Sequence, residues 1–256
     1  MMNFYKYQGT GNDFIMLDNR AGEWNTLEIS AIKMLCDRRF GIGADGLIKI
    51  NSAEGVDFEV DYYNSDGSKS FCGNGARCSV AFAHFLGIFK ESETTFTAID
   101  GLHQAEISGD IVKLKMSDVK DILKDGEDSV LNTGSPHYIK YVTEIADVNV
   151  FEEGKNIRYS PDYKDEGINV NFVEVLSDEK IFVRTYERGV EDETYSCGTG
   201  VTAAALTYLE KNSAMEIAVK TLGGDLKVYA DKNKGSFENI WLEGPARQVF
   251  NGEIEI

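Results

Sequence analysis

Apolar and polar residues alternate along several short stretches of the chain, which is typical of half-buried β-strands. The stretch Phe58–Tyr62 alternates apolar with charged residues, and apolar runs predict further strands at Met2–Tyr7 and Phe14–Leu17. Two more strands are predicted near Thr94–Ile99 and Gln104–Met116. The segments that favour helices are Leu27–Arg38, Ala76–Phe85 and Val201–Leu209. The chain therefore combines helices with many short strands.

One apolar stripe follows the second of these helices. Cys78, Phe82, Phe85 and Phe89 lie at positions i, i+4, i+7 and i+11, which place them on one helical face. We expect this face to pack in the core.

The pattern of the first half recurs in the second half. Three blocks match in the same order: Asn132–Ile139 echoes Gly9–Ile15, Ile181–Tyr186 echoes Phe58–Tyr63, and Gly223–Val228 echoes Gly101–Glu106. Their spacing also agrees, since 62 positions separate Gly11 from Gly73 and 64 separate Gly134 from Gly198. Because one short match arises easily by chance, the common order and spacing are what indicate an internal repeat.

The repeat predicts an α+β fold of two homologous, pseudo-symmetric domains, each a strand-rich layer wrapped around a central helix. We place the domains at residues 1–117 and 118–246, with residues 247–256 returning to the first half. The charged stretch Lys120–Asp128 has the composition of a linker between them. The active site is expected in the cleft between the two domains.

Charge limits the partners of the protein. The 256 residues include 26 Lys and Arg against 43 Asp and Glu, a net charge of −17. Nucleic acids and anionic membranes attract basic surfaces, so neither partner is expected. No basic-plus-apolar leader and no apolar run long enough to span a bilayer is found, which favours a cytoplasmic protein.

The four cysteines differ in their surroundings. Cys36 and Cys78 lie inside predicted helices and are interpreted as small buried hydrophobic residues. Cys72 and Cys197 each open a Cys-Gly-x-Gly motif directly before a predicted helix. The dipole and the unpaired N–H groups at a helix N-terminus favour the thiolate, by up to roughly 1.5 pKa units. These two thiols are therefore predicted to be poised for proton transfer.

Two such thiols suit the inversion of a carbon acid. Epimerisation needs a base on one face of the carbon and an acid on the other, and a thiolate and a thiol can exchange these roles. The backbone N–H groups of Gly73, Asn74, Gly198 and Thr199 would receive the substrate carboxylate as negative charge develops. An amino-acid epimerase or racemase, an isomerase, is the predicted class.

With these motifs the chain resembles the diaminopimelate epimerase family over nearly its whole length. The matching stretches are Gly9–Phe14, Asp37–Gly46, Asn64–Gly67, Cys72–Cys78, Gly134–His137, Asn169–Phe172, Glu187–Gly189, Cys197–Gly200 and Gly244–Ala246. The resemblance implies a cofactor-independent enzyme that interconverts LL- and meso-2,6-diaminopimelate in bacterial lysine and peptidoglycan synthesis. It also implies a homodimer whose only other partner is its small amino-acid substrate.

The resemblance assigns a role to each matching residue. Cys72 and Cys197 correspond to the catalytic thiolate and thiol. The positions that correspond to substrate-binding residues are Asn12, Asn64, Gly73, Asn74, Asn169, Glu187, Arg188, Gly198 and Thr199. His137 and Glu187 correspond to residues that tune the pKa values of the two cysteines. No metal ligand and no cofactor site is implied.

The chain departs from the family pattern at three places. Many members carry Gln where this chain has Gly46, and Asn where it has Ser135, and the loop at 190–193 is one residue longer here. Two alternatives stay open at this point. A proline racemase-like enzyme of the same fold would use the same cysteines on a cyclic amino acid, and a redox-responsive binding protein would form a reversible disulfide between them.

Overall fold

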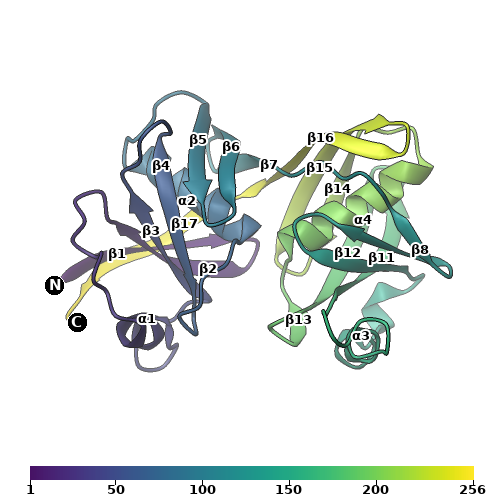
Figure 1. Ribbon diagram of the computed structural model, residues 1–256, viewed down its shortest axis with the longest axis horizontal. Helices are drawn as coiled ribbons and strands as arrows, with labels where there is room; N and C mark the ends of the chain where they lie inside the picture. The colour runs from purple at the N-terminus through teal and green to yellow at the C-terminus, as the bar shows by residue number, and fades with distance from the viewer. The chain divides into compact units, whose positions relative to one another are not determined.

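The computed structural model describes residues 1–256 and divides into two compact units. The first unit comprises residues 1–114 and 244–256, and the second comprises residues 115–243 (Figure 1). The chain leaves the first unit at the end of one strand, a few residues before the predicted boundary, and re-enters it near the C-terminus.

The first unit is a strand-rich layer with two helices. Its strands are β1 (Met2–Gly9), β2 (Asn12–Asp18), β3 (Gly46–Asn51), β4 (Phe58–Asn64), β5 (Glu93–Ala98), β6 (Gly101–Ser108), β7 (Ile111–Lys115) and β17 (Arg247–Ile254). Its helices are α1 (Ile29–Cys36) and α2 (Gly73–Phe85). Strand β17 pairs antiparallel with β1, so the C-terminal segment belongs to the same layer as the N-terminus.

The second unit has the same kinds of element. Its strands are β8 (Leu123–Asp125), β9 (Asp128–Asn132), β10 (Pro136–Tyr141), β11 (Asn169–Ser177), β12 (Lys180–Glu187), β13 (Asp192–Thr194), β14 (Glu216–Thr221), β15 (Gly224–Asn233) and β16 (Ser236–Pro245). Its helices are η1 (Ile145–Asp147, a 3₁₀ turn), α3 (Val150–Arg158) and α4 (Gly198–Lys211).

Strand pairing confirms the internal repeat. In the first unit β2 runs parallel to β3, β3 antiparallel to β4, and β4 parallel to β5. In the second unit β10 runs parallel to β11, β11 antiparallel to β12, and β12 parallel to β14. Each parallel pair is joined through a helix, as such a crossover requires. The α+β fold with two similar halves is therefore confirmed.

A buried helix lies inside each strand layer. Helix α2 contacts β1, β2, β3, β4 and β6, and α4 contacts β9, β10, β11, β12, β14 and β15 (Figure 1). A helix that is apolar on all sides is stable only when it is covered on all sides. The run Ala203-Ala204-Ala205 of α4 is fully buried, and its small side chains let the surrounding strands approach closely.

Several predicted boundaries are corrected by the structure. Both central helices begin three residues earlier than predicted, at Gly73 and Gly198. The predicted strand Gln104–Met116 is two strands, β6 and β7, because Gly109 adopts a positive φ of 62° in the turn between them. The charged stretch 120–128 contains β8, which pairs with β9 and exposes all three of its side chains.

The apolar stripe of α2 is only partly buried. Cys78 and Phe82 are completely buried, as expected, but Phe85 is 56% exposed. Phe85 is the last residue of the helix, where its ring packs on the edge of Tyr5. Phe89 lies beyond the helix and stacks on Phe58.

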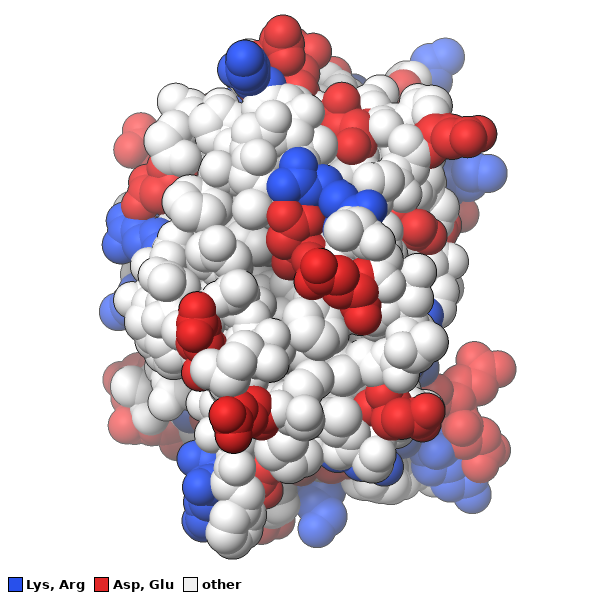
Figure 2. All heavy atoms as spheres, turned by 90° about the vertical axis from the view of Figure 1, so that its left-hand side faces the viewer, with Lys and Arg blue, Asp and Glu red and all other residues white.

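Charged side chains are scattered over the surface that Figure 2 shows, with no continuous basic patch. None of the helices combines the length and the apolar character that crossing a bilayer requires.

Candidate active site

Cys72 caps the N-terminus of α2. Its backbone is extended (φ −137°, ψ 117°), and its carbonyl accepts the first helical hydrogen bond, from the N–H of Ala76. The N–H groups of the residues that follow Cys72 have no acceptor within the helix itself. A Cβ atom added at Gly73 would meet no atom within 4 Å, so packing does not require glycine there. The open space leaves room for a ligand beside the thiol.

Two asparagines surround the sulfur of Cys72. The Sγ–H group donates to Oδ1 of Asn12 at 3.3 Å, and Nδ2 of Asn74 donates to the same oxygen at 3.3 Å. Nδ2 of Asn12 in turn donates to Oδ2 of Asp45 at 2.6 Å, which fixes the orientation of the Asn12 amide. The structure thus brings Cys72, Asn12 and Asn74 together.

A buried arginine hydrogen-bonds to one of these two asparagines. Arg77 is completely buried, and its Nη2 donates to Oδ1 of Asn74 at 3.0 Å and to Oγ1 of Thr10 at 3.2 Å. Burial lowers the pKa of Arg77, while thiolates at Cys78 and Cys72 would raise it. Because this attraction is mutual, the guanidinium favours the thiolate form of Cys72. Sequence reasoning assigned no role to Arg77.

A charged network holds Asp45 and thereby Asn12. Arg38 donates from Nη2 to Oδ1 of Asp45 at 2.8 Å and pairs with both oxygens of Asp13. The buried Lys6 forms an ion pair with Asp13 at 2.8 Å. Burial alone would raise the pKa of Asp13, but hydrogen bonds from Arg38 and Lys6 lower it to about 2. Asp13 therefore stays ionised at neutral pH and anchors Arg38.

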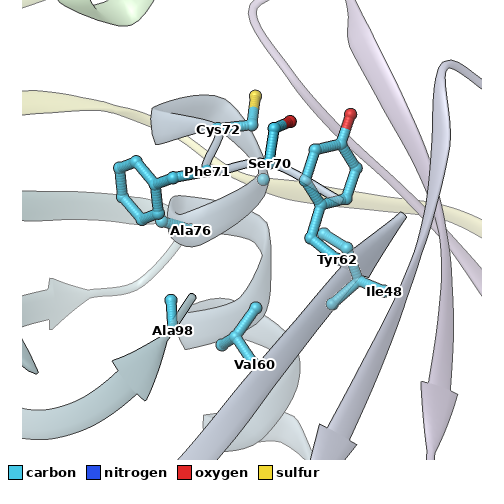
Figure 3. A pocket seen from close by; sticks show the side chains of 9 residues that line it. Ile48, Val60, Tyr62, Ser70, Phe71, Cys72, Ala76 and Ala98 are labelled. Atoms are coloured by element: carbon cyan, nitrogen blue, oxygen red, sulfur yellow. The ribbon is translucent and has the colours of Figure 1, made fainter. Parts of the chain in front are cut away.

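A small pocket opens beside Cys72 (Figure 3). Its lining residues are Ile48, Val60, Tyr62, Ser70, Phe71, Cys72, Gly75, Ala76 and Ala98. Asn64 reaches its edge, since its Nδ2 donates to Oγ of Ser70 at 3.0 Å. Asn64 thus contacts a residue that lines the same pocket as the predicted catalytic thiol.

Cys197 caps α4 in the same way as Cys72 caps α2. Its backbone is extended (φ −114°, ψ 112°), and its side chain is nearly buried. Its Sγ lies 3.4 Å from Oγ1 of Thr199, and that hydroxyl lies 2.9 Å from Nε2 of His137. A chain of hydrogen bonds therefore runs from His137 through Thr199 to the second thiol. Sequence reasoning assigned Thr199 only a backbone role.

The protonation of His137 can be worked out from its partners. Nδ2 of Asn171 donates both to the carbonyl of Tyr138 at 3.1 Å and to Nδ1 of His137 at 3.1 Å. Nδ1 is therefore the acceptor, and the ring proton lies on Nε2, directed at Thr199. Burial, aided by the charge of Arg188, lowers the pKa of His137 to about 3. A neutral His137 acts on Cys197 by hydrogen bonding and not as a cation.

Gly200 makes this arrangement possible. A Cβ at this position would overlap Oδ1 of Asn171 and lie 3.3 Å from Cε1 of His137. The absence of a side chain therefore lets the first turn of α4 approach His137 and Asn171 closely.

The other predicted binding residues of the second unit gather at the start of β11 and the end of β12. Asn169 donates to Oγ of Ser135 at 2.8 Å and accepts from the backbone N–H of Arg188 at 2.9 Å. The Arg188 guanidinium is exposed and donates to the carbonyl of Glu166 at 2.9 Å. Glu187 accepts from the hydroxyl of Thr194 at 2.9 Å. These contacts hold the Glu187-Arg188 pair at the end of β12.

The remaining cysteines, Cys36 and Cys78, are buried, as the sequence predicted. Burial raises the pKa of Cys36 to about 11 and that of Cys78 to about 12. None of the four cysteines forms a disulfide. No three His, Cys, Asp or Glu side chains gather as a metal site.

Comparison with known proteins decides the family. A family model described as "Diaminopimelate epimerase" matches residues 4–121 and 129–249. The chain belongs to the diaminopimelate epimerase family. It is 49% identical to a protein of Flavobacterium psychrophilum named diaminopimelate epimerase, over 99% of this chain and 100% of that relative. The predicted family is confirmed, and so is the prediction that the protein is an epimerase.

Two solved structures share the fold. A phenazine biosynthesis protein of the PhzF family from Bacillus anthracis has a TM-score of 0.75 at 16% identity and covers 100% of this chain and 99% of its own. A hydroxyproline epimerase from Agrobacterium vitis has a TM-score of 0.70 at 14% identity and covers 99% and 90%. At such low identity the likeness concerns the fold alone.

Proposed function

We propose that the protein interconverts LL- and meso-2,6-diaminopimelate by proton transfer between two cysteines, without a cofactor. Membership of the diaminopimelate epimerase family supports the substrate. The observation that carries the mechanism is that Cys72 and Cys197 both cap buried helices and both have a hydrogen-bonding group at the sulfur.

The proposed reaction conserves its protons. One cysteine, as the thiolate, removes the α-proton and becomes a thiol, and the electron pair of the broken C–H bond delocalises into the adjacent carboxylate. The other cysteine, as the thiol, delivers its proton to the opposite face of the carbon and becomes the thiolate. In the reverse direction the two side chains exchange roles. By the family resemblance, Cys72 acts on the LL isomer and Cys197 on the meso isomer.

The helix N-termini would stabilise the carbanion. Charge that flows into the carboxylate is best received by N–H groups that are already oriented, since they need no reorganisation during the reaction. We propose that the N–H groups of Gly73, Asn74, Gly198 and Thr199 serve this purpose.

The thiol environments suit these tasks. Arg77 and the dipole of α2 favour the thiolate at Cys72, and Asn12 accepts the proton of the thiol form. Thr199 accepts from His137 and can therefore donate its own proton to a thiolate at Cys197. We propose that His137 tunes Cys197 through this relay.

The distal amino-acid end of the substrate requires polar contacts of its own. We propose that Asn64, Asn169, Glu187 and Arg188 supply them, because an exposed guanidinium suits a carboxylate and Glu187 suits an ammonium. Family membership also supports a cytoplasmic homodimer active in lysine and peptidoglycan synthesis.

Single cysteine variants test the proposal. Cys72→Ala and Cys197→Ala should each abolish formation of meso- from LL-diaminopimelate, measured by chiral chromatography under reducing conditions. The control Cys36→Ala changes a buried thiol outside the site and should retain activity. An active Cys197→Ala enzyme would refute the two-base mechanism, whereas a wild-type enzyme that acts on L-proline instead would identify the proline racemase-like alternative.

A further inference from the structure

Position 46 has no room for a side chain. A Cβ on Gly46 would overlap the ring carbon Cε2 of Tyr62, would lie 3.0 Å from the hydroxyl oxygen of Tyr62, and would lie 2.5 Å from the carbonyl oxygen of Tyr63. The glycine is therefore coupled to Tyr62, whose ring occupies the space in front of β3. This aromatic residue comes from the next strand and fills the space that a side chain at position 46 would need.

The side chain of Tyr62 lies on the face of β4 that borders the pocket. Alternate residues of a strand share a face, so Val60, Tyr62 and Asn64 lie side by side. The register pairs Tyr62 with Ile48 and Asn64 with Gly46. Val60, Tyr62 and Ile48 all line the pocket beside Cys72.

The ring of Tyr62 is held firmly, and its hydroxyl points to the reactive side. Its ring meets the edge of Phe14, with the ring centroids 5.8 Å apart and an interplanar angle of 80°. Figure 3 shows the Tyr62 hydroxyl, the Ser70 hydroxyl and the Cys72 sulfur on the same side of the pocket, with Val60 and Ala98 on the other side. The pocket thus has an apolar floor and a polar rim.

We propose that the Tyr62 hydroxyl donates a hydrogen bond to a carboxylate oxygen of the substrate at the start of α2, so that Tyr62 is a substrate-contacting residue. This inference rests on the proposed function and adds a residue to its site. Three features favour a carboxylate over an ammonium: the positive end of the α2 dipole, the buried charge of Arg77, and the donor capacity of a phenol.

The position of the Tyr62 ring depends on the glycine at position 46. Any larger residue at position 46 displaces the ring that carries the hydroxyl.

Chemical labelling tests the contact without relying on turnover. Iodoacetate carries a carboxylate and iodoacetamide does not, so the ratio of their alkylation rates at Cys72 reports carboxylate binding beside the thiol. In Tyr62→Phe this ratio should fall about tenfold, since a hydrogen bond to a charged group is lost. The control Tyr63→Phe changes the neighbouring residue, whose hydroxyl donates to Asp61 at 2.9 Å, and should leave the ratio unchanged.

Kinetics with diaminopimelate supply the second readout. Tyr62→Phe should raise KM about tenfold with a smaller change in kcat, because the contact is made in both the bound substrate and the transition state. An unchanged labelling ratio together with an unchanged KM would overturn the role of Tyr62. If the wild-type enzyme fails to epimerise diaminopimelate, the proposed function fails, and the labelling ratio still decides whether Tyr62 contacts a carboxylate.

Discussion

Replacing Thr199 by Val removes one hydroxyl from the relay between His137 and Cys197. The side chains are similar in size, so the change deletes hydrogen bonds and leaves the packing nearly intact. The backbone N–H of residue 199, which is proposed to bind the substrate carboxylate, is retained. The variant therefore separates the side-chain role of Thr199 from its backbone role.

Two effects of this change can be estimated from the structure. Nε2–H of His137, a residue with 0% exposure, loses its acceptor at 2.9 Å, and a buried unpaired donor costs about 1–3 kcal/mol of stability. A thiolate at Cys197 also loses the hydroxyl 3.4 Å away. A hydrogen bond to a charged group contributes about 1.5–3 kcal/mol, which corresponds to roughly 10- to 150-fold in rate.

The assay is kcat/KM for diaminopimelate epimerisation, measured with thermal unfolding of the same variants. Thr199→Val should lose about 10- to 150-fold in kcat/KM and unfold at a temperature lower by about 2–4 °C per kcal/mol. The control Thr199→Ser keeps the hydroxyl and should stay within a few-fold of wild type. Equal activity of the Val variant and the wild type, or equal losses in Ser and Val, would show that the relay has no catalytic role.

Three further predictions concern groups around the two thiols. His137 is neutral in the folded protein because burial lowers its pKa from 6.5 to about 3. Since the unfolded chain takes up this proton below pH 6.5, the free energy of unfolding should fall by a few kcal/mol between pH 6.5 and about 3. Urea titrations should show a shallower fall for His137→Gln. Gly200→Ala should destabilise the protein by about 1–3 kcal/mol in urea titrations and slow turnover, since its Cβ would overlap Oδ1 of Asn171; an unchanged midpoint would contradict the close approach. Asp45→Asn should lower kcat/KM about tenfold, because Asn12 loses the carboxylate that orients its amide, and activity equal to wild type would show that Asn12 needs no such support.

Much of the fold could be predicted because the sequence repeats itself. Two halves with the same order of strands and helices followed from matched blocks such as Phe58–Tyr63 and Ile181–Tyr186, and the strand pairing of both units confirms them. Local details were less accessible. The turn at Gly109 and the exposed end of α2 at Phe85 depend on tertiary packing, which hydrophobic periodicity does not report.

The same limit applies to the candidate site. The motifs indicated both thiols and the family, but no motif indicated the buried Arg77 that contacts Asn74 or the relay through Thr199. Tyr62 had a detectable signal, since it stands two residues before Asn64 in an alternating strand. Its coupling with Gly46 depends on the register of two strands, which only the structure supplies.

The central claim is that one cysteine removes the α-proton from one face of the carbon and the other cysteine delivers a proton to the opposite face. Deuterium incorporation at low conversion tests it: LL-diaminopimelate is incubated with enzyme in D₂O, and the recovered substrate and the meso product are analysed separately by mass spectrometry. The account predicts deuterium at the inverted α-carbon of the product and almost none in the recovered substrate, because the removed proton stays on one thiol while the other supplies deuterium. Equal labelling of substrate and product, or no labelling at all, would contradict it.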